Sequence, residues 1–201
     1  MCTFTMIYKL LEDYPIIARA RNPQRSRGLL ALDILRECST SKDAIEYLMN
    51  PDIRPLYRPG NFIVADNRNA WHVLWDHVTT SWRLMPGPYA IGVVTIYPGI
   101  KMNKRAEKIG PDSDKRRRRA FQLLNGFQPE NVDAAIDKMM KVSADHEYGK
   151  TTASICWHSD EYKQTSSTIM AIASNPKLSR VLYCPGNACE TQFEEYRVSF
   201  D

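Results

Sequence analysis

A cysteine directly follows the initiator methionine in the opening residues MCTFTMIY. If Met1 is removed, Cys2 carries both a thiol with a pKa of about 8.5 and an α-amine with a pKa of about 8. A nucleophile paired with an N-terminal amine needs no histidine, because the amine accepts the proton that the thiol gives up. The alternative interpretation is that Cys2 is a small apolar residue at the start of a strand.

Two arginines and an asparagine lie where they could serve this nucleophile. The extended segments TFTMIY and YPIIARA are separated by a turn signal and predict a hairpin. Because a hairpin returns its far end to its beginning, Arg19, Arg21 and Asn22 should lie near Cys2. A guanidinium favours thiolate over thiol, and an asparagine amide can donate to an oxyanion. These residues therefore predict an acyl-transfer site, or else a solvated strand end.

The remaining chain alternates between helical and extended patterns. Helices are expected over 27–38, 43–49, 113–127 and 129–142, and strands over 61–66, 70–76, 88–98, 151–158, 166–174, 179–184 and 193–200. Apolar residues lie on all sides of the helical wheel of the first helix, which predicts that this helix is buried. Thr40 with Asp43 forms a capping-box pattern before the second helix. We expect one domain over 1–201, of α+β class, with helices layered against largely antiparallel sheet.

Composition narrows the class of protein. The chain shows no export signal and no apolar run long enough for a membrane span, so we expect a cytoplasmic protein without a membrane partner. The five cysteines are odd in number and scattered, which predicts free thiols. A net charge of +4 without a recognised motif does not favour nucleic acid as a partner. Alternation of Trp71, Val73 and Trp75 fits a core or a homo-oligomer interface equally.

Potential metal ligands gather in the last third of the chain: Asp145, His146, Cys156, His158, Cys184 and Cys189. No pair has the close spacing of a structural zinc site, so neither a metal nor another cofactor is expected. Cys156 and Cys184 fall in strand patterns and are expected in the core. His146 is expected to be a surface or capping residue.

A basic run, KRRRR, covers residues 115–119. On a helix with an apolar face, such a run is usually a solvated face. The alternative is a grip on phosphate, either of coenzyme A or of a nucleotide.

Several motifs, taken in order, resemble one superfamily. They are MCTF, Arg21-Asn22, RGLLALDILRECSTSKDAIEYL, GNFIVAD, SDKRRRRAFQLL, SICWHSD and LYCPGNACETQFEEY. Together they resemble the N-terminal-nucleophile hydrolases, in particular acyl-coenzyme A:penicillin acyltransferase-like proteins and the choloylglycine hydrolase and penicillin V acylase group. A looser similarity exists to the Asn-Arg-Asp-Glu family.

The resemblance implies a four-layer αββα sandwich, here shortened, with Cys2 as the nucleophile. Arg21 and Asn22 match the start of the family's Arg-Asn-x-Asp pattern, and Asn61 is a candidate oxyanion donor. Three positions depart from the family: Gln24 replaces an aspartate, Ile96 an asparagine and Trp157 an arginine.

These observations lead to three hypotheses. The first is a hydrolase or acyltransferase that cleaves a small-molecule amide or acyl thioester through a Cys2 acyl-enzyme. The second is a relative that kept the sandwich but lost catalysis and now serves binding or assembly. The third is a cyclohydrolase-like enzyme that opens or closes a nucleotide ring.

Overall fold

The computed structural model describes residues 4–8, 16–17, 26–53, 56–57, 60–75, 79–94, 104–160 and 164–196. The chain divides into two units, one made of residues 1–19 and 87–201 and the other of residues 20–86. The predicted residues Cys2, Arg19, Arg21, Asn22, Gln24 and Ile96 lie outside the described residues.

In the first unit, the N-terminal strand β1 (Phe4–Tyr8) lies between two antiparallel partners, β2 (Ile16–Ile17) and β6 (Gly87–Ile91). Ile7 pairs with Ile17 on one side, and Phe4 pairs with Ile91 on the other. The predicted hairpin is therefore confirmed over its described part. β1 is also the central strand of its sheet, because the later strand β6 occupies its second edge.

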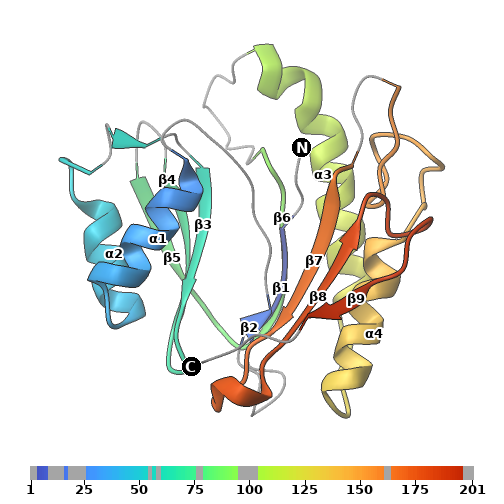
Figure 1. Cartoon of the computed structure of the whole chain (residues 1–201). Coiled ribbons are helices and arrows are strands. Elements are labelled where there is room, and N and C mark those ends of the chain that lie inside the picture. The colour runs from blue at the N-terminus through green and yellow to red at the C-terminus, as the bar shows by residue number, and fades with distance from the viewer. Residues whose placement is uncertain are drawn as a thin grey trace. The chain divides into compact units, whose positions relative to one another are not determined.

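The same unit contains a second antiparallel sheet, in which β8 (Arg180–Pro185) lies between β7 (Ser166–Ala171) and β9 (Glu194–Tyr196). A short 3-10 helix, Pro176–Leu178, joins β7 to β8. The helices α3 (Lys104–Leu124) and α4 (Val132–Ser143) pack on this sheet (Figure 1). Their shared core is apolar and consists of Ala120, Leu124, Ala135, Ile136, Met139, Val142, Ile169, Ala171 and Leu182.

Helix α4 follows directly from its sequence pattern, because its buried residues recur with the spacing of one helical face. Asn131 caps it by accepting a hydrogen bond from the Ala134 N–H at 2.9 Å. The expected start at Pro129 is wrong. An extended Asn131 precedes the helix, which begins at Val132.

The second unit places α1 (Arg27–Glu37) and α2 (Ser41–Met49) on the sheet β3-β4-β5. The strands are β3 (Gly60–Ala65), β4 (Ala70–Trp75) and β5 (Thr79–Leu84), all antiparallel. The capping box before α2 is confirmed, with the Thr40 hydroxyl and the Asp43 carboxylate each accepting from the other's backbone N–H. The core of this unit consists of Leu30, Ile34, Ala44, Leu48, Tyr57, Val73 and Trp75.

Further expectations about individual elements are wrong. Helix α3 begins at Lys104 rather than at residue 113. Helix α1 is not buried all round: Leu30 and Ile34 face the core, whereas Leu35 is 77% exposed. Apolar residues all around the helical wheel predicted complete burial, but only one face of α1 packs on the sheet. The segment 151–158 forms turns rather than a strand, because the carbonyl of Thr151 accepts from the Ser154 and His158 N–H groups within the segment.

The described residues thus form an α+β protein in which each unit has helices packed on antiparallel sheet. Among the described helices, none has both the length and the apolar character that a membrane crossing requires.

Candidate functional site

The predicted site residues are divided between described and undescribed parts of the chain. Cys2, Arg21 and Asn22 lie outside the described residues, whereas Asn61 lies in β3 of the second unit. The Oδ1 atom of Asn61 is 2.9 Å from Nε2 of His72, on the neighbouring strand β4. Since this hydrogen bond fixes the amide, Asn61 has a defined orientation. Burial lowers the pKa of His72, which favours the neutral ring.

Trp157, which replaces the arginine of the family pattern, is buried at 5% exposure. Its carbonyl accepts a hydrogen bond from the Asn187 amide at 3.4 Å. An aromatic side chain in this interior position supplies no positive charge. The structure therefore accounts for the tryptophan as a core residue, with Ala153 and Cys156 buried in the same segment.

The basic run on α3 does not form a simple solvated face. Arg116 is only 1% exposed and donates through Nη1 to the Thr152 carbonyl. Arg117 and Arg118 both bind the Asp114 carboxylate on their own helix, at 2.8 and 2.6 Å. These guanidinium groups bind a carbonyl and a carboxylate of the chain itself. The run therefore has less free positive charge for binding phosphate than its sequence predicts.

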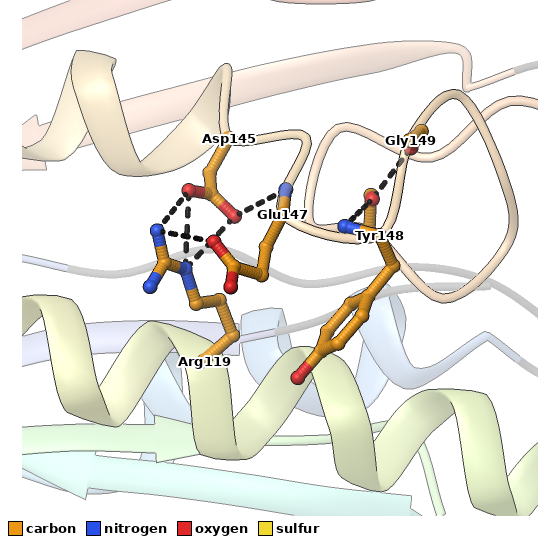
Figure 2. Close-up of polar contacts among 6 residues, drawn as sticks. Arg119, Asp145, Glu147, Tyr148 and Gly149 are labelled. Carbon is orange, nitrogen blue, oxygen red and sulfur yellow. Dashed lines mark hydrogen bonds and ion pairs between the residues drawn. The ribbon is translucent and has the colours of Figure 1, made fainter.

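Arg119 joins α3 to the residues that follow α4 (Figure 2). Its guanidinium binds the Asp145 carboxylate, with Nη2 to Oδ2 at 2.9 Å, and the Glu147 carboxylate at 3.0 Å. The hydrogen bond to Asp145 is the largest cause that raises the pKa of Arg119, and Glu147 adds to it. The two carboxylates flank His146 in sequence, so the ion pairs fix the backbone on both sides of this histidine.

Four side chains of the last third converge beside this ion pair: His146, Cys156, His158 and Cys189. Their possible ligand atoms all lie within 4.8 Å of one another. Nε2 of His146 lies 3.0 Å from Nε2 of His158, and the Cys189 sulfur lies 3.5 Å from the same His158 atom. Cys156 is buried, both histidines are half-buried and Cys189 is exposed. We call this group the Cys-His cluster.

Short-range hydrogen bonds shape the loop that carries three members of the cluster. The Cys156 N–H donates to the Asp145 carbonyl at 3.1 Å, and the His158 N–H donates to the Thr151 carbonyl at 3.2 Å. The Ser154 hydroxyl bridges the Tyr148 N–H and the Gly149 carbonyl, at 3.1 and 2.6 Å. Figure 2 shows Tyr148 and Gly149 in this turn. The loop therefore closes on itself and brings His146, Cys156 and His158 together.

The fourth member comes from the turn after β8. Gly186, whose φ of 85° suits a residue without a side chain, precedes Asn187, and the Asn187 carbonyl accepts from Glu190 and Thr191. The Asn187 amide nitrogen lies 3.0 Å from Nδ1 and 2.9 Å from Nε2 of His158. An ion pair at 2.8 Å joins Lys150 to Glu190 and links this turn to the loop.

Burial acts strongly on the ionisable groups of the cluster. Burial of the thiol is the largest cause that raises the pKa of Cys156, to about 12, and the side chain of the neighbouring Cys189 also raises it. Desolvation lowers the pKa of His158, and the Lys150 ammonium lowers it further. The free protein thus holds the Cys156 thiol protonated and favours a neutral His158 imidazole at pH 7.

The sequence-based interpretation of the cluster residues was partly wrong. Cys156 and Cys184 are buried as expected, but Cys156 lies in turns rather than in a strand. His146, expected as a surface or capping residue, is half-buried, and its Nε2 lies 3.0 Å from Nε2 of His158. Sequence spacing alone gives no sign of a metal site, because the fold brings residues 146 and 189 together from separate segments. Only the high density of Cys and His in this region signalled the cluster.

In comparisons with known protein families, curated proteins and solved structures, no match to this chain was found. The resemblance to N-terminal-nucleophile hydrolases therefore stays a prediction from the motifs.

Proposed function

We propose that the protein is an N-terminal cysteine amidohydrolase or acyltransferase that acts on a small amide or acyl thioester. The observation that supports this proposal is the position of β1. This strand starts at Phe4, two residues after Cys2, and has hydrogen-bonded partners on both sides. Chain termini usually fray unless a sheet or a docked element holds them. A nucleophile requires a rigid support, so a paired central strand that begins two residues after Cys2 favours the proposal.

In the proposed reaction, removal of Met1 makes Cys2 the first residue. The Cys2 sulfur attacks the substrate carbonyl carbon, and the thiol proton passes to the Cys2 α-amine. Collapse of the tetrahedral intermediate breaks the C–N or C–S bond, and the leaving group takes that proton. Water or a second nucleophile then releases the acyl group and restores the thiol. Arg21 favours the thiolate in this proposal, and Asn22 donates to the oxyanion.

The architecture of each unit supports the finer fold proposal, an αββα sandwich. Helices packed on antiparallel sheet, the arrangement from which such a sandwich is built, are present in each unit taken by itself. The nucleotide alternative has less support, because the basic run on α3 is engaged by Asp114, Asp145 and Glu147.

The test of this proposal begins with the intact mass of the purified protein, where loss of Met1 is expected. Chromogenic amides and acyl thioesters are then assayed with wild type, Cys2→Ala and a control, Cys38→Ala, which changes a half-buried thiol of the second unit. We expect turnover by wild type and Cys38→Ala, none by Cys2→Ala, and an acyl adduct on Cys2 by mass spectrometry. Retained Met1, or undiminished turnover by Cys2→Ala, would refute the proposal.

A further inference from the structure

We propose that the chain binds one tetrahedral Zn²⁺ ion through the four side chains of the Cys-His cluster: His146, Cys156, His158 and Cys189. This inference is independent of the proposed function, because Cys2 is not one of the ligands.

The spacing of the candidate donor atoms supports the proposal. With Zn–N bonds of about 2.0–2.1 Å and Zn–S bonds of about 2.3 Å, a tetrahedral shell separates two nitrogens by about 3.3 Å and a nitrogen from a sulfur by about 3.6 Å. The two imidazole Nε2 atoms of His146 and His158 are 3.0 Å apart, and the Cys189 sulfur is 3.5 Å from Nε2 of His158. These two distances are within a few tenths of an ångström of that shell. All four donor atoms lie within 4.8 Å of one another, so closing the shell around a common ion requires the most widely separated atoms to move by about 1 Å.

The chemistry of the donors selects the metal. Two thiols and two imidazoles are the ligand set of structural zinc sites, whereas Ca²⁺ and Mg²⁺ require oxygen ligands. The protein would supply all four ligands, which leaves no open position for a substrate or an attacking water. The site is therefore structural rather than catalytic.

Residues around the cluster support the ligands as an outer shell would. The Arg119 ion pairs with Asp145 and Glu147 hold the backbone on either side of His146. The Cys156 N–H donates to the Asp145 carbonyl at 3.1 Å, which holds Cys156 close to the backbone that carries His146. The loop is therefore organised around these side chains before any ion enters.

Bound zinc would join two segments that are distant in sequence. His146, Cys156 and His158 lie in the loop after α4, whereas Cys189 lies in the turn after β8. In the described structure, the Lys150–Glu190 ion pair and the Asn187 contacts already link these segments. Four coordinate bonds would make that link far stronger, and the ion should stabilise the first unit.

The test uses the reduced, chelator-treated full chain and Co²⁺ or Zn²⁺ alone as the probe. Titration with Co²⁺ should reach one equivalent per chain, with the visible bands of tetrahedral cobalt and near-ultraviolet charge transfer from two thiolates. Zn²⁺ should displace Co²⁺. At about 100 times its dissociation constant, Zn²⁺ should raise the melting temperature by about 5–10 °C.

Cys189→Ser is the first variant, because Cys189 is exposed and its replacement should not disturb the core. This variant should reduce the charge-transfer intensity to that of one thiolate. Loss of an outer-shell residue weakens metal binding by about 10–100-fold, and loss of the ligand Cys189 should weaken Zn²⁺ binding by at least as much. His146→Asn should weaken binding similarly. The matched controls Cys38→Ser and His72→Asn change a thiol and an imidazole of the other unit and should bind like wild type.

The proposal is overturned if the reduced wild type does not bind one equivalent of Co²⁺ or Zn²⁺. It is also overturned if Cys189→Ser retains two thiolate ligands and wild-type affinity, because the ion would then lie elsewhere. Cys2→Ala distinguishes this proposal from the enzymatic one, since it should abolish turnover and leave metal binding unchanged.

Discussion

Replacing Arg119 with glutamine should destabilise the first unit by removing the cation that binds Asp145 and Glu147. The Arg119 side chain is 23% exposed and that of Asp145 only 12%. Its guanidinium makes contacts of 2.9 Å to Asp145 and 3.0 Å to Glu147. A hydrogen bond to a charged group contributes about 1.5–3 kcal/mol, and the variant leaves Asp145 shielded from water without its cation. We expect the free energy of unfolding to fall by about 2 kcal/mol.

Arg118→Gln provides a matched control on the same helix. Its side chain is 70% exposed, and its partner Asp114 also binds Arg117. The substitution removes the same charge and the same side chain, but water can solvate the carboxylate that remains. Exposed ion pairs contribute about 0.2–1 kcal/mol, so the loss should stay below about 1 kcal/mol.

Urea denaturation of the chelator-treated proteins, followed by circular dichroism, measures both losses. Chelation matters because a bound metal would add its own stability near His146. A double-mutant cycle with Asp145→Asn then isolates the pair, with an expected coupling energy of about 1–2 kcal/mol. Equal losses for the Arg119 and Arg118 variants, or strict additivity in the cycle, would refute the reasoning.

Two further predictions concern the second unit. Burial opposes ionisation of Asp66, but hydrogen bonds from the Ser41, Asn69 and Arg68 N–H groups outweigh it and lower the pKa of Asp66 to about 2. Because this pKa lies below the unfolded value, the carboxylate stabilises the fold above about pH 4, and this contribution is lost as the pH falls toward about 2. Urea midpoints of wild type should therefore fall relative to those of Asp66→Asn over this range, and parallel profiles would contradict the prediction. On α1, Ile34→Ala should cost about 2–4 kcal/mol and Leu35→Ala less than about 0.5 kcal/mol, because Ile34 is 9% and Leu35 77% exposed. Similar losses at these adjacent positions in denaturant titrations would show that α1 buries a different face.

Local patterns in the sequence predicted most of the elements. Helix α4 and the capping box of α2 were predictable because their signals involve residues three or four positions apart. The strands β3, β4, β7 and β8 were predicted from β-branched and alternating residues and lie within one or two residues of the expected bounds, apart from the longer expectation for β7. The hairpin of β1 and β2 followed from a turn signal between two extended runs.

Other features depended on contacts that local patterns do not encode. The apolar wheel of α1 predicted burial, but only the Leu30 and Ile34 face found a sheet to cover. The segment 151–158 has strand-like residues, yet hydrogen bonds to Asp145 and from the Ser154 hydroxyl fold it into turns. The sequence shows the positive charge of the basic run, but it does not show that Arg119 pairs with Asp145 and Glu147, which follow α4.

The sequence by itself determined which donors the protein has: three cysteines and two histidines in its last third, and a cysteine at position 2. Only the tertiary structure decided that His146, Cys156 and His158 meet Cys189. The physical reason is the antiparallel pairing of β7 with β8, which places the segment before β7 next to the turn after β8. Hydrogen bonds within that segment and within that turn then bring the four side chains together. Spacing along a chain predicts a ligand pair within one turn or helix, whereas a site assembled from separate segments exists only once those segments have folded together.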